Sequence, residues 1–173
     1  MAPVRCVVDT NVVATAEGGN PGAGANCRAA SAEALAAVMK QGHLFIDDQE
    51  AILTEYLRVV SPGQPEAGGA FVKWTLQNQW NDALVTRVPI TPQTGGPTEY
   101  RELPAPTLGT TYDRSDQKFL AVAAAHGERP PVLQSFDSKW WGWQASLAAC
   151  GVTVHFLCPR EIAVKFEEKM GGE

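Results

Sequence analysis

Long hydrophobic runs are absent from this sequence. No apolar run approaches the roughly 20 residues that a helix needs to span a bilayer. The N-terminus also lacks the basic start, the apolar core and the small-residue cleavage site of a secretory signal peptide. We therefore expect no contact with membranes and a cytoplasmic location.

Cysteine is scarce and irregularly spaced. The chain has 4 cysteines, Cys6, Cys27, Cys150 and Cys158, and no pair has the CxxC or another zinc-like spacing. Isolated buried cysteines usually act as small hydrophobic residues. We therefore expect all 4 thiols to be reduced, in agreement with a cytoplasmic location.

An excess of basic residues is also missing. The chain has 14 Lys and Arg against 19 Asp and Glu, which gives a formal net charge of −5. This balance argues against a protein that holds nucleic acid by bulk positive potential alone. It is compatible with an enzyme whose acidic cluster is neutralised by a divalent metal ion.

What the sequence does contain is an alternation of apolar stretches and helical patterns. Strands are expected at 4–8, 43–47, 83–90, 131–136 and 152–157, and helices at 28–40, 48–60, 70–81, 113–127 and 140–150. Asp47 followed by Glu50 predicts a variant capping box at the start of one helix. The alternation predicts an α/β fold, a three-layer α/β/α sandwich around a mostly parallel sheet. We expect one domain over 1–173, in which the Pro- and Gly-rich segment 61–112 is an elaboration.

Polar residues interrupt the most strand-like stretch, VRCVVDTNVV. Asp9 stands there, and a buried ionised carboxylate is costly unless something pairs with it. Asp9 therefore either leaves the core at the end of a strand or faces a cation. Ligands of parallel sheets bind outside the carboxyl ends of the strands. Asp137 follows another strand, so we expect both carboxylates at the same edge of the sheet.

Two further carboxylates come from helices. Asp116 shares a helix face with Phe119 and Leu120, which is the wrong face for a merely solvated charge. The alternative is that Asp116 caps the free amides of the first turn. Glu55 lies at the margin of an apolar stripe, where a surface ion pair with Arg58 is the alternative.

Considered together, the four acids predict a metal site. Carboxylates that converge raise each other's pKa unless a cation compensates their charge. Ligation by oxygen atoms alone suits Mg²⁺ or Mn²⁺ rather than zinc. Asp9 is then tolerated because it faces a metal ion.

The same residues resemble a PIN-domain nuclease. The matching segments are VVDTNVV, AILTEYLRVV, DRSDQKFLAVAAAHG and SFD, followed by FLCPREI near the end, and they occur in the order expected for the family. The resemblance implies a PIN-like sandwich and metal-dependent hydrolysis of phosphodiester bonds, usually those of RNA, to a 5′-phosphate and a 3′-hydroxyl. The segment 61–112 departs from the simplest members because it is longer and richer in Pro and Gly.

The resemblance also assigns roles to individual residues. It implies catalysis and metal binding by Asp9, Glu55, Asp116 and Asp137, where Glu55 either binds the metal or orients the attacking water, and a supporting role for Asn11, Ser135 and Asp113. Mg²⁺ or Mn²⁺ is the implied cofactor, and no histidine is needed as a base. The resemblance to toxin ribonucleases suggests an antitoxin protein as a partner, and a second copy of the chain is a further expected partner.

The expected substrate is single-stranded or loop RNA, whose phosphodiester bonds and bases are exposed. Arg114, Lys118 and Lys139 flank the acidic residues and either contact phosphates or remain solvated surface charges. The segment KWWGW could stack on unpaired bases. We expect at least two of Trp140, Trp141 and Trp143 to pack a helix against the sheet instead.

Two other functions compete with this hypothesis. The first is a non-catalytic module of the same fold that binds RNA or another protein. The second is a phosphatase with a strand-end aspartate nucleophile, but that class resembles D-x-D-x-T, and Asp9-Thr10-Asn11 lacks the second acid. Cleavage of RNA or of a small phosphomonoester distinguishes them.

Overall fold

A five-stranded parallel sheet forms the centre of the described chain. The computed structural model describes residues 1–107 and 109–172. The strands are β1 (Arg5–Val8), β2 (His43–Asp47), β3 (Val85–Val88), β4 (Val132–Gln134) and β5 (Val154–Phe156), and their order in the sheet is β3-β2-β1-β4-β5. Every neighbouring pair is parallel. The expectation of a mostly parallel sheet is confirmed.

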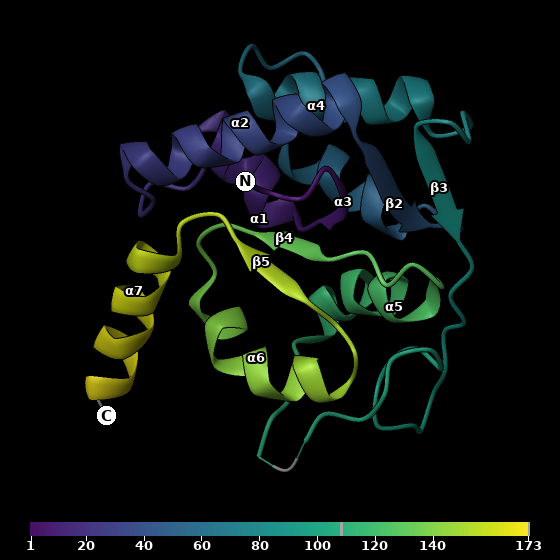
Figure 1. Cartoon of the computed structure of the whole chain (residues 1–173), viewed down its shortest axis with the longest axis vertical. Coiled ribbons are helices and arrows are strands. Elements are labelled where there is room, and N and C mark those ends of the chain that lie inside the picture. The colour runs from purple at the N-terminus through teal and green to yellow at the C-terminus, as the bar shows by residue number, and fades with distance from the viewer. Residues whose placement is uncertain (108, 173) are drawn as a thin grey trace.

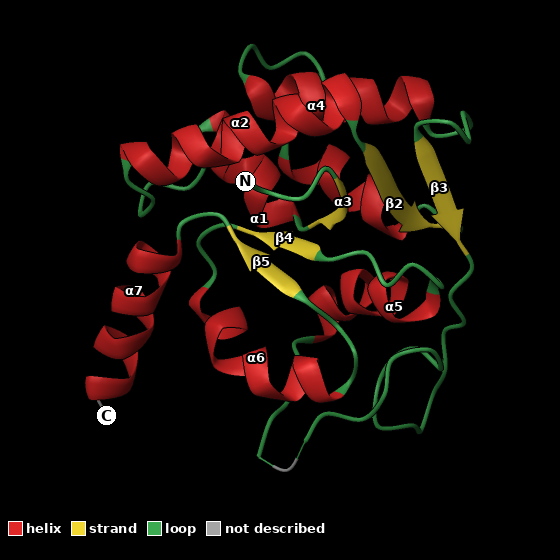
Figure 2. Cartoon of the chain, viewed as in Figure 1, coloured by secondary structure: helices red, strands yellow, loops and turns green. Residues whose placement is uncertain are grey.

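Helices cover both faces of this sheet. They are α1 (Thr10–Glu17), α2 (Ala25–Gln41), α3 (Ala51–Val59), α4 (Ala67–Asn78), α5 (Gln117–Ala125), α6 (Ser138–Ala149) and α7 (Pro159–Gly171), with a 3₁₀ turn at Arg114–Asp116. Figure 1 shows α1, α2 and α4 on one side of the sheet and α5 and α6 on the other, with α7 projecting beside α6. Figure 2 shows the same layers by element type. The expected three-layer α/β/α sandwich is confirmed.

Burial of the central strands explains this layering. Every residue of β2 is buried, and so is β1 apart from Arg5. A strand that is buried on both faces needs a helical layer on each side.

No helix in the described ranges is both long enough and apolar enough to cross a membrane.

Two helices were not expected from the sequence. Helix α1 begins directly after Asp9, whose side chain accepts a hydrogen bond from the Asn11 N–H at 2.9 Å, and it ends at Gly18, where φ is +86°. Its β-branched valines favour strands slightly, so in the sequence they look like a continuation of β1. Helix α7 begins at Pro159, a residue favoured at the first helical position.

The predicted capping box at Asp47 is wrong. Helix α3 begins at Ala51, and Glu50 before it adopts a left-handed conformation with φ of +65°. The Asp47 carboxylate instead reaches forward and accepts hydrogen bonds from the N–H groups of Ala51 and Ile52, each at 2.9 Å. Asp47 therefore stabilises the helix start from the end of β2.

The segment 61–112 is integrated into the sandwich. It supplies α4 and the edge strand β3, which pairs with β2 over four residues. Farther along the segment, Leu103 and Tyr112 are buried and hold the connecting loop against the rest of the fold. Its Pro- and Gly-rich composition marks the loops around these elements.

The expectation of reduced thiols throughout is wrong for one pair. Cys27 and Cys158 form a disulfide with a Cα–Cα distance of 5.2 Å, whereas Cys6 and Cys150 are free and buried. The two bonded cysteines are 131 residues apart in the sequence. Sequence spacing cannot reveal such a pair, because the fold alone places the start of α2 beside the residue before α7.

Candidate active site

The strand-end carboxylates lie at the carboxyl ends of two adjacent strands. Strand β1 pairs with β4, and Val8 lies opposite Leu133. Asp9 directly follows β1 and caps α1, and Asp137 caps α6 by accepting a hydrogen bond from the Lys139 N–H at 3.1 Å. Both carboxylates therefore stand where a parallel sheet binds its ligands.

Asp9 is the most deeply placed acid of the group. Its residue surface is only 3% exposed, and Oδ2 accepts hydrogen bonds from the Asn11 N–H at 2.9 Å and from Gln134 Nε2 at 3.0 Å. Burial and the charge of Asp116 raise the pKa of Asp9 to about 8, although both hydrogen bonds oppose that rise. Ionised Asp9 therefore needs a further positive charge.

Asp116 is the second buried acid. It is 9% exposed, and its Oδ2 is buried without a hydrogen-bond partner. Burial raises its pKa to about 7; Lys139 opposes that rise, while Asp137 and Asp113 add to it. The side chain makes no capping hydrogen bond to α5. The capping alternative therefore does not account for this residue.

Lys139 places a positive charge beside three of the acids, Asp113, Asp116 and Asp137. Its Nζ contacts the Asp113 carboxylate and lies 3.6 Å from Asp137 Oδ2 and 3.9 Å from Asp116 Oδ2. Partial burial disfavours the charged form of Lys139, but the hydrogen bond to Asp113 and the charges of Asp137 and Asp116 outweigh it and raise the lysine pKa. We call Asp9, Asp113, Asp116, Asp137 and Lys139 the acidic cluster.

Glu55 is paired with a lysine from the neighbouring helix. It forms an ion pair with Lys118, and the two side chains are 14% and 10% exposed. Lys118 also donates a hydrogen bond to the Ser115 carbonyl. The electrostatic influence of Glu55 reaches Asp116, whose pKa it helps to raise. Arg58, the partner considered from the sequence, is not the partner in this ion pair.

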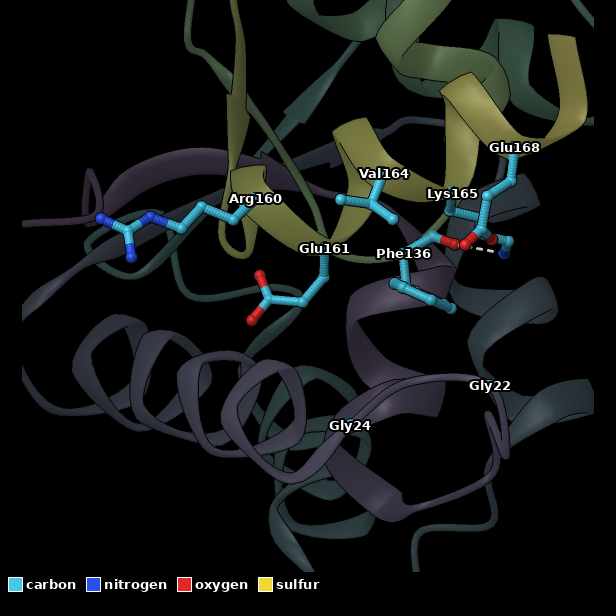
Figure 3. Close-up of a pocket in the computed structure, with 8 residues that line it drawn as sticks. All are labelled: Gly22, Gly24, Phe136, Arg160, Glu161, Val164, Lys165 and Glu168. Carbon is cyan, nitrogen blue, oxygen red and sulfur yellow. Dashed lines mark hydrogen bonds between the residues drawn. The ribbon is translucent and has the colours of Figure 1, made fainter. Parts of the chain in front are cut away.

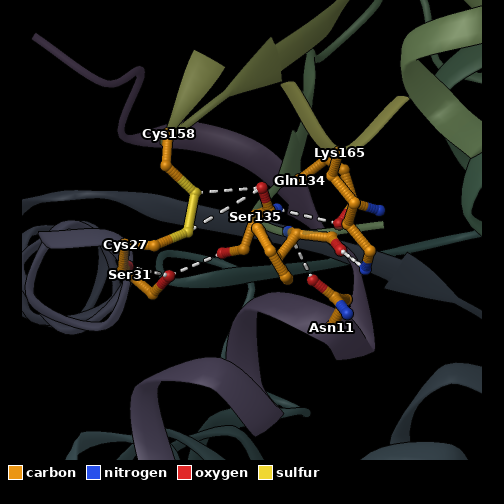
Figure 4. Close-up of a disulfide and its surroundings, with 8 residues drawn as sticks. Asn11, Cys27, Ser31, Gln134, Ser135, Cys158 and Lys165 are labelled. Carbon is orange, nitrogen blue, oxygen red and sulfur yellow. Dashed lines mark hydrogen bonds between the residues drawn. A yellow bond between two sulfur atoms is a disulfide. The ribbon is translucent and has the colours of Figure 1, made fainter. Parts of the chain in front are cut away.

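The remaining predicted residues divide between the site and its surroundings. Arg114 lies on the surface and pairs with Glu99 at 2.6 Å. Asn11 Oδ1 accepts a hydrogen bond from the Phe136 N–H at 2.7 Å and so ties α1 to the segment before Asp137. Ser135 Oγ lies 2.5 Å from Ser31 Oγ of α2, next to the disulfide (Figure 4).

Gln134 was not expected in the site. It is fully buried, donates to Asp9, and accepts a hydrogen bond from the Ser135 N–H at 2.8 Å through Oε1. A polar amide within a buried strand needs hydrogen-bond partners. The glutamine in VLQSF was therefore the available signal, but the sequence does not show that its partner is Asp9, directly after β1.

The donor atoms fit a hard divalent cation, but the side chains are not arranged as a finished metal site. Within residues 1–107 and 109–172, no three His, Cys, Asp or Glu side chains form a group ready to hold a metal ion. The fit rests on the partnerless Asp116 Oδ2 and on a donor set made of carboxylates. Thr10 and Ser138, next to Asp9 and Asp137, also have buried hydroxyl oxygens without partners. Lys139 already stands beside Asp113, Asp116 and Asp137, so a bound metal ion would compete with its ammonium group for these carboxylates.

A separate pocket lies beside the cluster. It has a volume of about 560 Å³ and is lined by Phe136 and by residues of α7, including Lys165 and Arg160 (Figure 3). Lys165 Nζ donates to the Phe136 carbonyl at 2.9 Å and lies 4.1 Å from the centre of its ring. None of the four predicted catalytic acids lines this pocket, so it is not the centre of the candidate chemistry.

Comparisons with protein-family models, with curated proteins and with solved structures find no match to this chain. The likeness to PIN domains therefore rests on the quoted motifs. The function is inferred from the geometry and chemistry of the acidic cluster.

Proposed function

We propose that this chain is a PIN-type, metal-dependent endoribonuclease that hydrolyses phosphodiester bonds in single-stranded or loop RNA. The observation that carries the proposal is the pair of buried carboxylates, Asp9 and Asp116, whose charges oppose each other. Asp116 additionally has an oxygen without a partner. A protein keeps such a repulsive pair at a cost in stability, which a bound cation offsets.

Asp9, Asp116 and Asp137 would hold Mg²⁺ or Mn²⁺, and Glu55 either joins them or orients the attacking water. A metal ion bound there supplies stabilisation of the charge that develops on the phosphate and lowers the pKa of water. Asn11 and Gln134 hold the Asp9 carboxylate by two hydrogen bonds. By the family resemblance, the products are a 5′-phosphate and a 3′-hydroxyl.

The cations near the cluster have different proposed roles. Lys139 is 45% exposed, so its ammonium group can leave the carboxylates and neutralise a substrate phosphate. Lys118 is buried against Glu55 and is better placed to fix that carboxylate than to reach RNA. Arg114, whose side chain is 85% exposed, can contact a phosphate farther along the strand.

The proposal includes a biological setting taken from the same resemblance. The chain would act as the toxin of a toxin–antitoxin pair in the cytoplasm, bind an antitoxin protein, and form a homodimer. The disulfide between Cys27 and Cys158 is the observation that counts against the cytoplasm, because disulfides are rare there.

One observation favours the second candidate, a non-catalytic module that binds RNA or protein. The ammonium group of Lys139 already compensates part of the negative charge of Asp113, Asp116 and Asp137. A cluster with a built-in cation can be stable without a metal ion. In that case the acids would be structural, and no cleavage would follow.

Cleavage assays on a mixture of single-stranded and hairpin RNAs separate these candidates. We expect activity with Mn²⁺ or Mg²⁺, none with EDTA, and none for Asp9→Asn with either ion. Asp82→Asn, which removes an exposed carboxylate before β3, is the matched control and should retain full activity. Cleavage that survives both EDTA and Asp9→Asn would contradict the mechanism, and hydrolysis of a small phosphomonoester instead of RNA would favour a phosphatase.

A further inference from the structure

A second pocket directly adjoins the acidic cluster. It has a volume of about 450 Å³ and is lined by Thr110, Thr111, Asp113, Lys139, Trp143 and Phe166, together with two glycines. Asp113 and Lys139 belong to the cluster as well, so the pocket and the candidate active site share a wall. A group bound in this pocket would lie beside a phosphate held at the cluster.

Two aromatic residues provide the apolar wall of this pocket. Phe166 comes from α7 and Trp143 from α6, which pack against each other (Figure 1). Trp143 is only 7% exposed and packs in a T-shaped arrangement with Tyr112, so little of its ring is free to contact a ligand. Phe166 is partly exposed, so it is the aromatic ring of this pocket with more accessible surface.

Gly142 sets the position of the Phe166 ring. A Cβ atom at this glycine would lie 2.8 Å from Phe166 Cε2, closer than such atoms approach in proteins. The absence of a side chain on α6 therefore lets the phenyl ring settle against that helix. Gly142 and Phe166 together therefore form the part of the pocket wall where α6 and α7 meet.

Another part of the lining is polar. The loop before the 3₁₀ turn contributes Thr110 and Thr111, whose hydroxyl groups can donate and accept hydrogen bonds. A pocket of this size falls in the range of about 300–1,000 Å³ that small-molecule sites occupy. One aromatic wall and one hydroxyl-bearing wall match a flat ring with a polar edge, which describes a nucleobase.

We propose that this α6–α7 pocket holds one unpaired nucleobase of the RNA strand, adjacent to the phosphate at the acidic cluster. The inference rests on the proposed function, because it identifies the nucleobase subsite of that same site. The base would lie against Phe166, and Thr110 and Thr111 would contact its polar edge. A paired base cannot enter, so the pocket would also explain a preference for single-stranded RNA.

Binding of short labelled RNAs tests the pocket without requiring turnover. Fluorescence anisotropy would be measured with EDTA, where cleavage is off, and repeated with Mn²⁺. RNAs with a single abasic nucleotide at successive positions would be compared with the intact strand. For the wild-type protein, one position should lower the affinity roughly tenfold, the typical effect of losing one stacked base.

Phe166→Leu completes the comparison. It should weaken binding of the intact RNA by a similar factor and remove the extra loss caused by the abasic position, because both changes delete the same contact. Gly142→Ala, which displaces the ring without removing it, should act in the same direction. Trp80→Leu is the control, since Trp80 is 71% exposed and stacks on Arg87 elsewhere. Thermal melts would verify that each variant is folded.

The outcomes separate the pocket from the enzyme. Three results would overturn the proposed base-binding role of the pocket. The first is additive losses of affinity in Phe166→Leu and with the abasic RNA, the second is no abasic effect at any position, and the third is no RNA binding under either condition. A coupled loss in binding, accompanied by no cleavage with Mn²⁺, would support the pocket and contradict the proposed nuclease activity.

Discussion

The inner and outer parts of the acidic cluster differ in how their negative charge is compensated. Asp9 and Asp116 are buried, and the pKa of each is raised, to about 8 and about 7. Asp113 and Asp137 have side chains that are 44% and 25% exposed, and Lys139 stands beside both. The inner part thus lacks enough positive charge, whereas the outer part has a cation that can move. Metal binding is expected to depend on the first and to be modulated by the second.

Removal of one inner charge should have the largest effect on the affinity for Mn²⁺. Asp116→Asn deletes a proposed metal ligand, so the affinity for Mn²⁺ measured by calorimetry should fall more than about 100-fold, beyond the effect typical of groups that only support ligands. The metal-free variant should melt at the same or a higher temperature, because a repulsive charge is gone. Asp113→Asn, an acid of the outer part, is the matched comparison and should lower affinity much less. Equal losses of Mn²⁺ affinity in both variants would contradict the proposed difference between the inner and outer acids.

The hydrogen bond from Gln134 should have the next largest effect. Gln134→Leu leaves Asp9 with one of its two hydrogen bonds, and loss of a group that orients a ligand typically costs about 10–100-fold in metal affinity. Gln144→Leu changes an exposed glutamine of α6 and serves as control. Unchanged Mn²⁺ affinity in Gln134→Leu would show that Asp9 needs no such support.

The stability of the metal-free protein should depend on pH in an unusual direction. Because Asp9 and Asp116 have folded-state pKa values above the ordinary 3.8, the native state binds more protons than the unfolded state between about pH 4 and 8. The free energy of unfolding therefore falls as the pH rises through this range. Melting temperatures in EDTA should decrease from about pH 5 to about pH 8, and Asp9→Asn should flatten the curve. A stability that rises over this interval would contradict the charge assignment.

Lys139 should have the smallest effect on binding. Lys139→Gln removes the cation that competes with the metal ion, so Mn²⁺ should bind several-fold tighter, while RNA cleavage should fall because a phosphate contact is lost. Lys73→Gln, on the exposed surface of α4, controls for the change in net charge. Weaker Mn²⁺ binding in Lys139→Gln would mean that the lysine supports the site rather than competing for it.

The sequence predicted most of the layer structure because apolar periodicity is local. The strands at 4–8, 43–47 and 152–157 correspond to β1, β2 and β5, and the packing of Trp140 and Trp143 is confirmed by their burial. Helix α1 was missed because Val12 and Val13 continue a strand-like pattern that a cap at Asp9 overrides. Local patterns can be decided by such a single side-chain hydrogen bond.

Partnerships across the fold could not be read from the chain. The disulfide of Cys27 and Cys158 spans 131 residues, and the hydrogen bond of Gln134 to Asp9 spans 125. Likewise, the sequence placed Lys139 near the acids but could not show that its ammonium group stands among three of them. Contacts of this kind depend on strand order and register, which no local pattern specifies.

A crystal soaked with Mn²⁺ tests the central claim most directly, because anomalous scattering locates the ion without any assumption about activity. We predict a Mn²⁺ peak held by oxygen atoms of Asp9, Asp116 and Asp137, with Lys139 Nζ moved away from these carboxylates. A structure in which Lys139 keeps its place among the acids and no peak lies beside Asp9 and Asp116 would contradict the proposed metal centre.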